Sequence, residues 1–419
     1  MDLASSTAGA NIPNRVTIAI AGVIMQVALG AVYAWSVFST PLEEAYGGAS
    51  TTAVNITFSI TIFTLGFAAF AGGIWMRSVG PRVVAVTAGI LYGGGVFLAS
   101  FSSSSLFLLY ITYGVLGGIG IGLGYIVPIA TLVKWFPDKR GFITGIAVAG
   151  FGAGALVTGP IGGFFARTVG IFPTFAILGI FYLIAVVGAG LFMRNPPEGY
   201  SPGGSRVSSG SGQREEVSLE FGTAIRTWQW FALWAILFLN VTAGIALISE
   251  ASPMSQAITG VGAGLGGILV GIISVGNGAG RFLWAWLSDA IGRKWVFFTM
   301  FLLQVVLFLL LPVAGAFFFF AILAFIIATC YGGGFGTMPA FAADYFGPAD
   351  VGRIYGLMLT AWGFGGILGP ILISVIVDTT GAYTVALYII AAILLLSAII
   401  PFMARPPQVG GKETATRVR

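Results

Sequence analysis

The sequence predicts an all-α membrane protein with twelve transmembrane helices in two six-helix halves. Three observations support this fold class. Of the 419 residues, 57% are hydrophobic and only 8% are charged, whereas an ordinary soluble domain is about one quarter charged. Apolar runs of about 20 residues, the length of one spanning helix, recur along the chain. Two pairs of segments, one member in each half, also share a pattern.

Twelve apolar runs define the expected helices, and Pro312 and Gly315 separate the ninth run from the tenth. Because helix ends are the least certain part of such a prediction, the bounds are approximate. The expected spans are 17–38, 54–76, 83–101, 106–133, 142–166, 171–193, 227–248, 258–287, 296–315, 316–343, 354–377 and 382–403.

A long polar segment divides the twelve helices into two groups of six. The sequence NPPEGYSPGGSRVSSGSGQREEV is rich in Pro, Gly and Ser, which is typical of a flexible linker. We therefore expect an N-terminal half over residues 1–193, a cytoplasmic linker over 194–226, a C-terminal half over 227–403 and a cytoplasmic tail over 404–419.

The distribution of Lys and Arg predicts the orientation in the membrane. If both termini are cytoplasmic, 17 of the 19 basic residues fall in cytoplasmic loops or tails. Arg167 lies on the other side and Arg281 lies within a span. This asymmetry follows the positive-inside rule. We expect a monomeric, multi-pass protein of the plasma (inner cell) membrane, in contact with the lipid bilayer.

The composition argues against several classes of function. Cys330 is the single cysteine and there is no histidine, so a disulfide framework and the usual metal ligands are absent. We expect no metal, no cofactor and no enzymatic activity. The net charge of +5 resides mostly in loops and does not indicate nucleic-acid binding.

The repeated segments relate the two halves. WFPDKRGFITGIAVAGFGAGALVTGP, from Trp135 to Pro160, resembles YFGPADVGRIYGLMLTAWGFGGILGP, from Tyr345 to Pro370. Likewise GGIWMRSVGPR, which ends at Arg82, resembles WAWLSDAIGRK, which ends at Lys294. Two related six-helix halves joined by a linker are the plan of a secondary transporter that works by alternating access.

The loop motif and two helix motifs resemble known transporter families. SDAIGRK is similar to the loop motif of the major facilitator superfamily, with Asp289 as its acid and Arg293 and Lys294 as its bases. The first-half copy ends in Arg82 and has Arg77 in place of the acid. AVYAWSVFSTPL resembles the oxalate/formate antiporter group, and WFPDKRGFITGIAVAG resembles a signature of the monocarboxylate transporters. The resemblance implies the major facilitator fold.

One permanent charge lies inside a predicted span, in GIISVGNGAGRFLWAWL. Such a charge costs roughly 2.5–3.5 kcal/mol on insertion scales. Arg281 precedes Asp289 by eight residues, which is roughly 12 Å of helix. Asn277, four residues earlier, shares its helix face. No acid lies at mid-span in the expected ranges, so Arg281 either ties its helix to a neighbour or binds an anionic substrate through its planar fork of donors.

The resemblance implies what this arginine does. Members of both groups carry an arginine in helix 8 that binds the substrate carboxylate, and Arg281 occupies that position. Many animal monocarboxylate transporters have an aspartate where this chain has Asn277. Oxalate-transporting relatives have a lysine in a helix 11 segment like LTAWG, where this chain has Trp362. One cation complements one carboxylate, so we expect a small monocarboxylate anion of the lactate/pyruvate class.

Further polar residues at mid-span are candidates for the wall of the site, with interhelical packing as the alternative for each. They are Gln26, Tyr33, Tyr125, Asn240 and Tyr331. The resemblance favours symport with a proton, for which Glu250 and Asp378 are the candidate acids. The missing acid at Asn277 favours exchange of organic anions instead, and a membrane receptor that senses an anion is the third alternative.

Overall fold

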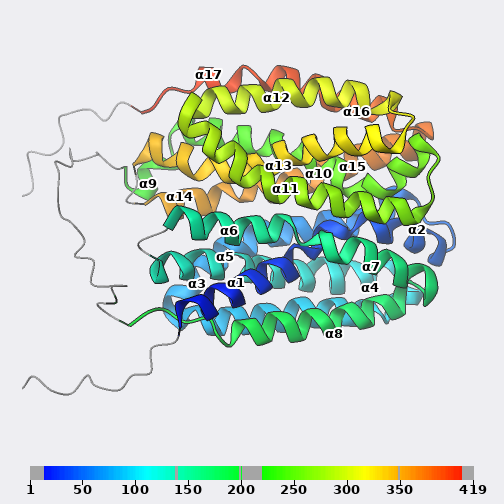
Figure 1. The fold of residues 1–419 in the computed structure, drawn as a ribbon, viewed down its shortest axis with the longest axis horizontal. Helices are drawn as coiled ribbons and strands as arrows, with labels where there is room; N and C mark the ends of the chain where they lie inside the picture. Colours follow the sequence, from blue (N-terminus) through cyan, green and yellow to red (C-terminus); the bar gives the residue numbers. More distant parts are fainter. Residues whose placement is uncertain (1–13, 137–139, 198–199, 201–218, 348–349, 408–419) are drawn as a thin grey trace, which may run out of the picture.

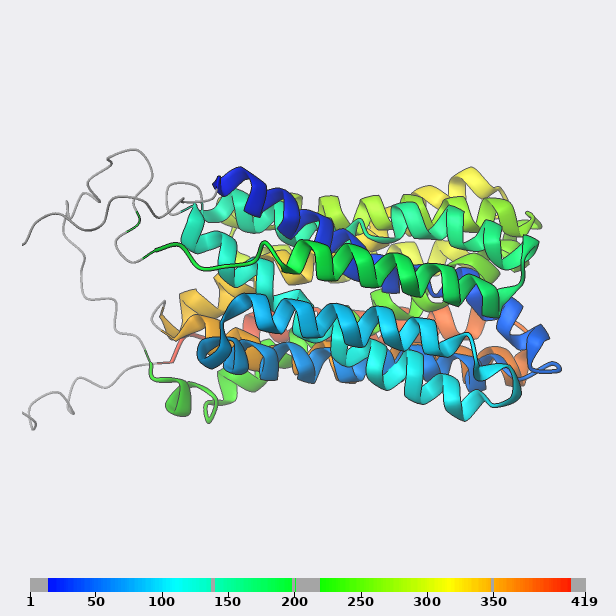
Figure 2. The ribbon, with the colours of Figure 1, turned by 90° about the horizontal axis from the view of Figure 1, so that it is seen from below.

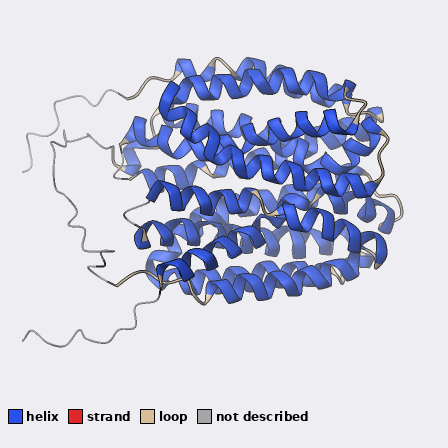
Figure 3. Cartoon of the chain, in the orientation of Figure 1, coloured by secondary structure: helices blue, strands red, loops and turns tan. Residues whose placement is uncertain are grey.

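The computed structural model describes residues 14–136, 140–197, 200, 219–347 and 350–407. Of the predicted linker, residues 198–199 and 201–218 lie outside this part, as do residues 408–419 of the predicted tail. The described residues are almost entirely helical (Figure 3). Eleven of the described helical segments are long and apolar enough to cross a membrane. One of them, α3 (Thr51–Ala99), is bent at Gly80 and supplies two spans, so the described chain has twelve.

The helices of the first half contain several local breaks. Helix 1 is interrupted by a 3₁₀ turn, and helix 4 contains a π-helical turn. The elements are α1 (Arg15–Leu29), η1 (Gly30–Ala34), α2 (Ser36–Ala45), α3, η2 (Ser102–Ser104), α4 (Leu106–Leu109), η3 (Tyr110–Gly117), α5 (Gly118–Trp135), α6 (Arg140–Gly152), α7 (Ala155–Thr168) and α8 (Ile171–Gly190).

The second half begins with a short helix that precedes its first span. The elements are α9 (Phe221–Ala224), α10 (Trp228–Thr259), α11 (Ala263–Ile291), α12 (Arg293–Leu310), η5 (Leu311–Val313), α13 (Phe317–Phe346), α14 (Val351–Met358), α15 (Thr360–Thr380), α16 (Thr384–Ser397) and α17 (Ile400–Met403).

All long helices run roughly parallel to one axis, with the first-half helices beside the second-half helices (Figure 1). Helix α1 begins and α17 ends at the same end of the bundle (Figures 1 and 2). We call this the terminal end, and the opposite one the distal end.

The repeated loop motif has the same backbone in both halves. Gly80 has φ 80° and Gly292 has φ 92°, a region that favours glycine because it has no Cβ. Each glycine separates two consecutive membrane helices at the terminal end. The alignment of RSVGPR with SDAIGRK therefore reflects a shared turn and not only a shared composition.

The predicted bounds of helix 7 were wrong. The expected span ended at residue 248, but α10 continues to Thr259 and ends at Gly260, whose φ is 72°. The hydroxyls of Ser255 and Thr259 donate to backbone carbonyls of their own helix at 2.8 and 2.7 Å, so these polar groups are satisfied inside it. As a result, Glu250 lies within a spanning helix and not at its end.

The two halves approach closely where helix 5 is broken. A Cβ on Gly152 would lie 2.8 Å from Cα of Gly278 on α11, so only glycine fits. Ser274 of α11 spans the break, since its hydroxyl donates to Gly152 O and accepts from Ala155 N, both at 2.9 Å. This contact fixes α11, which carries Arg281, against the first half.

Candidate functional site

Arg281 lies ten residues before the end of α11 and is 2% exposed. Its guanidinium donates to Asn277 Oδ1 at 3.3 Å, to the Tyr125 hydroxyl at 3.4 Å and to the Tyr33 hydroxyl at 3.5 Å. The ion pairs of the described residues involve Arg293 and Arg353, and none involves Arg281. The buried cation thus has long hydrogen bonds to neutral groups from three helices.

Aromatic rings surround this cation. Its Cζ lies 4.8 Å from the ring centroid of Phe335 and 5.7 Å from that of Phe151. Trp362 packs against the same two rings, with centroid distances of 4.8 and 5.6 Å. The Tyr33 and Tyr331 hydroxyls share a hydrogen bond of 2.9 Å that joins η1 to α13 across the halves. Cation–π contacts of this kind stabilise a desolvated cation without neutralising it.

Glycines on α13 set the position of α11 at the site. A Cβ on Gly332 would lie 2.0 Å from the Asn277 carbonyl oxygen, and one on Gly336 would lie 2.0 Å from the Arg281 carbonyl oxygen. Gly332 and Gly336 are one helical turn apart, as are Asn277 and Arg281. The two helices therefore touch backbone to backbone over this turn. This contact brings Tyr331 and Phe335 of α13 beside the guanidinium.

A cavity of about 520 Å³ reaches Arg281 from the terminal end. It lies between α6, α11 and α13, and its lining extends along α11 from Arg281 to Asp289. The exposed side chains of Phe282 and Trp286 lie at its outer side. Arg281 thus lines a cavity although only 2% of the residue is exposed.

Two donors at the site have no hydrogen-bond partner among the described residues. They are the Nδ2 amide of Asn277 and the Nε1 indole nitrogen of Trp362, both buried. The Tyr331 hydroxyl is close to the indole N–H, and the Tyr33 hydroxyl is close to the Asn277 side chain, but both contacts lie outside hydrogen-bond geometry. Because an unpaired buried donor is costly, such groups call for an explanation, and a ligand that accepts from them is one.

The remaining wall candidates have contacts of a different kind. Gln26 donates from Nε2 to the Tyr125 backbone oxygen at 3.3 Å, which links α1 to α5. Asn240 donates to Cys330 O at 3.2 Å and accepts from Gln304 Nε2 at 3.1 Å, which links α10, α12 and α13. None of these three bonds reaches Arg281; they connect helices, and a substrate-binding role for Gln26 or Asn240 stays a prediction.

The second-half loop motif forms a cluster of charges at the terminal end. Arg293 pairs with Asp289 at 2.5 Å and with Asp344 of α13 at 3.2 Å. The Lys294 ammonium lies 5.9 Å from the Tyr345 ring centroid. In the first-half copy, Arg82 is exposed and has no ion pair among the described residues. Among the residues that the structure describes, the motif thus links helices 8, 9 and 10 of the second half and makes no such link in the first.

Glu250 is fully buried near the distal end of α10, in a cluster that joins the two halves. Asn55 of α3 donates to its Oε1, and the Tyr383 hydroxyl donates to Oε2 at 2.7 Å. The indole of Trp35 donates to Asn55 Oδ1 at 2.8 Å. Asn55 also donates to the Ser374 hydroxyl of α15 at 3.3 Å, so four helices and the start of a fifth meet here.

Asp378, the other candidate acid, is exposed and caps a helix. Its two carboxylate oxygens accept from the backbone N–H groups of Thr51 and Thr52 at 3.1 and 2.9 Å. These are the first residues of α3, where a negative charge is favourable. Nearby, burial raises the pKa of the Glu43 carboxyl, while a hydrogen bond with Thr51 acts in the opposite direction.

Some residues of these clusters were not predicted from the sequence: Phe151, Phe335, Asn55 and Tyr383. Phe335 is four residues after Tyr331 and therefore shares its helix face, a signal that sequence spacing carries. Asn55 stands near the start of its predicted span and is polar in an apolar run. Phe151 and Tyr383 gave no comparable signal, because aromatic residues are common in these spans.

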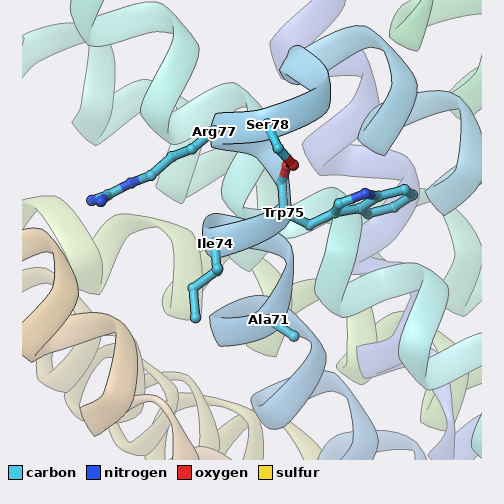
Figure 4. Close-up of a pocket in the computed structure, with 5 residues that line it drawn as sticks. All are labelled: Ala71, Ile74, Trp75, Arg77 and Ser78. Carbon is cyan, nitrogen blue, oxygen red and sulfur yellow. The ribbon is translucent and has the colours of Figure 1, made fainter.

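Another groove lies on the outer face of α3 near the terminal end, lined by Ala71, Ile74, Trp75, Arg77 and Ser78 (Figure 4). All five residues come from one stretch of a single helix, and their side chains do not converge on a common point (Figure 4). This groove is separate from the cavity at Arg281.

Comparison with known proteins covers nearly the whole chain. The Major Facilitator Superfamily model matches residues 18–263 and 221–418. The oxalate:formate antiporter of Oxalobacter formigenes is 28% identical over 403 residues, covering 92% of this chain and 91% of that protein. Monocarboxylate transporter 12 of Rattus norvegicus is 25% identical over 355 residues, covering 78% and 73%.

A solved structure has the same fold. It is a bacterial homologue of the human lysosomal transporter Spinster, in an inward-facing and unoccupied conformation. The TM-score is 0.72 with 14% identity, and the match covers 94% of this chain and 97% of that one.

Proposed function

Since the chain belongs to the Major Facilitator Superfamily, whose members are transporters and not enzymes, we propose that it carries small monocarboxylates of the lactate/pyruvate class. Arg281 binds the carboxylate, and the two halves, residues 1–193 and 227–403, rock about this site by alternating access. The observation that carries the proposal is the buried guanidinium, which has neutral hydrogen-bond partners and lines a cavity.

The charge balance of the site supports a single carboxylate. A guanidinium offers two parallel donors that match one carboxylate, and the rings of Phe151 and Phe335 exclude water around the pair. The position of Trp362 holds a neutral indole in place of a second cation. A dicarboxylate would therefore leave one charge buried without a partner, which is unfavourable.

The contacts at the two ends support access from the terminal end. At the distal end, Glu250 and Asp378 of the second half hold Asn55 and Thr51 of the first half. At the terminal end, the cavity leads to Arg281. With the orientation that the basic residues predict, the carrier opens to the cytoplasm in this state, both termini are cytoplasmic, and the membrane is the plasma membrane.

Glu250 supplies the proton step of the proposed symport. A buried carboxylate whose hydrogen-bond donors are all neutral is costly when ionised. The titratable groups that face it are Tyr383, Glu43 and Asp378, and none is a cation. A proton taken from the distal side removes the repulsion among these acids and weakens the acceptor for Asn55, so loading and opening of the distal end are coupled.

The test uses purified protein in liposomes with labelled lactate, with and without an inward proton gradient, beside Arg281→Ala. We expect uptake into anion-free vesicles that the gradient drives and that the variant lacks. If Arg281→Ala transports lactate normally, the proposal is wrong and the arginine is a structural tie.

Exchange of organic anions is the second candidate. The neutral Asn277 beside Arg281 favours it, because no acid is there to balance the cation when the carrier is empty. An exchanger avoids closing around the unneutralised arginine. Uptake that requires vesicles preloaded with an organic anion, and that does not respond to pH, would support exchange and contradict symport.

A further inference from the structure

The second-half copy of the loop motif lies in a cluster of balanced charges. Arg293 pairs with Asp289 of its own motif and with Asp344 of α13. These two acids offset the two bases Arg293 and Lys294, so the cluster has no net charge. The acids that stabilise this end of the second half are therefore supplied by the protein itself.

The first half has cations at both positions where the second half has these acids. The aligned motifs place Arg77 at the position of Asp289. Lys134 directly precedes Trp135, the first residue of the aligned segment, and Asp344 precedes the matching residue of the second half. The same end of the two halves thus differs in charge although the backbone turn is shared.

Three cations of the first half, which we call the basic patch, have no acid as a partner in the described part of the chain. They are Arg77, Arg82 and Lys134. The two arginines are exposed and make no ion pair there. The Lys134 ammonium donates to the neutral Asn195 Oδ1 at 3.0 Å. The described acids of this half both lie in α2, at the distal end. The positive charge of the patch is therefore not offset by these residues.

The groove of about 680 Å³ on the outer face of α3 leads to the basic patch (Figure 4). Its lining begins with Ala71 and Ile74, which are apolar and exposed within the span, and ends with Arg77. Ala71 precedes Arg77 by six residues, or roughly 9 Å of helix. Ile74 and Arg77 point to the same side of α3 (Figure 4). A lining spread along one helix in this way suits an elongated amphiphile better than a compact solute.

We propose that the basic patch and this groove bind an anionic phospholipid of the leaflet at the terminal end. The lipid phosphate contacts Arg77 and Arg82, and an acyl chain follows Ile74 and Ala71 toward the bilayer centre. The lipid thus supplies to the first half the negative charge that acids supply to the second. Binding is confined to the first half, because the matching cluster of the second half has no net charge.

Charge complementarity selects the headgroup. Cations at the membrane surface attract anionic lipids, and a guanidinium matches the oxygens of a phosphate. A zwitterionic headgroup carries a cation of its own, which offsets the phosphate and is repelled by the patch. Trp75, which lines the same groove, is a residue type enriched at the membrane interface, where its ring packs beside lipid headgroups.

The experiment compares phosphatidylglycerol with phosphatidylcholine of the same acyl chains, titrated onto the purified protein in detergent and counted by native mass spectrometry. Arg77→Asp gives the first-half motif the acid of the second-half motif. Arg405→Gln, at an exposed position after α17 at the same end, is the matched control. We expect the wild type to bind the first phosphatidylglycerol at least about tenfold more tightly than phosphatidylcholine. Arg77→Asp should weaken it roughly 20- to 30-fold, because two unit charges change and each contributes about fivefold. The control should change it by less than about sixfold.

The outcomes are decisive in either direction. Equal affinity of the wild type for the two lipids overturns the proposal. An equal loss in Arg77→Asp and Arg405→Gln also overturns it, because the effect would then come from diffuse surface charge. If glycerol 3-phosphate displaces phosphatidylglycerol, the ligand is a soluble phosphate and the lipid assignment is wrong. Should Arg77→Asp lose its monodisperse profile, the double variant Arg82→Gln/Lys134→Gln decides, since it also changes two unit charges, and an unchanged affinity in it overturns the proposal.

Discussion

Arg281 and Glu250 are two buried charges of opposite sign on consecutive helices, and their surroundings differ. Arg281 lies beside a cavity, holds three long hydrogen bonds to neutral groups and has two unpaired donors nearby. Glu250 has donors on both carboxylate oxygens, from Asn55 of the first half and from Tyr383 of the second. The site at Arg281 has more hydrogen-bond donors than acceptors, whereas the carboxylate of Glu250 has its hydrogen-bond donors within the protein.

In the proposed symport, this difference corresponds to two separate roles in one transport cycle. A site that lacks an acceptor is suited to bind an anion that comes and goes. The Glu250 cluster is complete only when the two halves are in contact. Because a proton changes the charge of this cluster, protonation can be coupled to that contact. Separating the two roles means that the substrate and the proton need not share one residue, which fits the neutral Asn277 beside the arginine.

The largest expected effect comes from changing the fork of donors at Arg281 while keeping its charge. Arg281→Lys retains one cation but loses the bidentate geometry and the flat contact with Phe335. We expect kcat/KM for lactate to fall about 10- to 100-fold, because charge-assisted hydrogen bonds contribute about 1.5–3 kcal/mol each. Uptake kinetics in liposomes measure it, and a variant with wild-type kinetics would show that any cation suffices.

Glu250→Gln tests the other charge. The amide keeps an acceptor for Asn55 and mimics the protonated acid, but it cannot release a proton. We expect accumulation driven by a proton gradient to fall about tenfold or more, while exchange of labelled for unlabelled lactate continues. Asn55→Ala is the companion variant, since it removes one bond to the carboxylate and leaves the acid in place. Equal loss of exchange and accumulation in Glu250→Gln would contradict a proton role.

A third change tests how the helix contact positions Arg281. In Gly336→Ala the new Cβ would lie 2.0 Å from the Arg281 carbonyl oxygen, so α11 and α13 must separate. We expect a loss of about 1–3 kcal/mol in stability, typical of overpacking, and a raised KM for lactate. Gly188→Ala in α8 is the control, because its Cβ would meet no atom within 4 Å. Thermal unfolding of both variants by scanning fluorimetry, with uptake assays, measures the difference.

The fold class and the twelve spans could be predicted from the sequence. So could the location of Arg281 within a span, because charged residues are rare in these helices. Sequence reasoning misplaced the end of helix 7, because the hydroxyls of Ser249 and Ser255 bond carbonyls of the preceding turn and α10 continues through Pro253. It therefore located Glu250 at a helix end. The roles of Phe151, Phe335 and Tyr383 follow from which helices pack together. The periodicity of one sequence does not contain that information.

The smallest expected effect concerns Asp378, which sequence reasoning treated as a proton carrier beside Glu250. Its oxygens accept from the first two N–H groups of α3 at the distal end, an exposed capping contact between the halves. Removing such a cap costs about 0.5–2 kcal/mol, and here the loss applies only to the state in which the distal ends meet. Asp378→Ala should therefore shift the carrier toward the distally open state. A membrane-impermeant maleimide should then label a cysteine placed at Thr52 a few-fold more than in the parent protein. Accumulation of substrate driven by the proton gradient should persist. Loss of accumulation without increased labelling would reverse the assignment and make Asp378, rather than Glu250, the group that carries the proton.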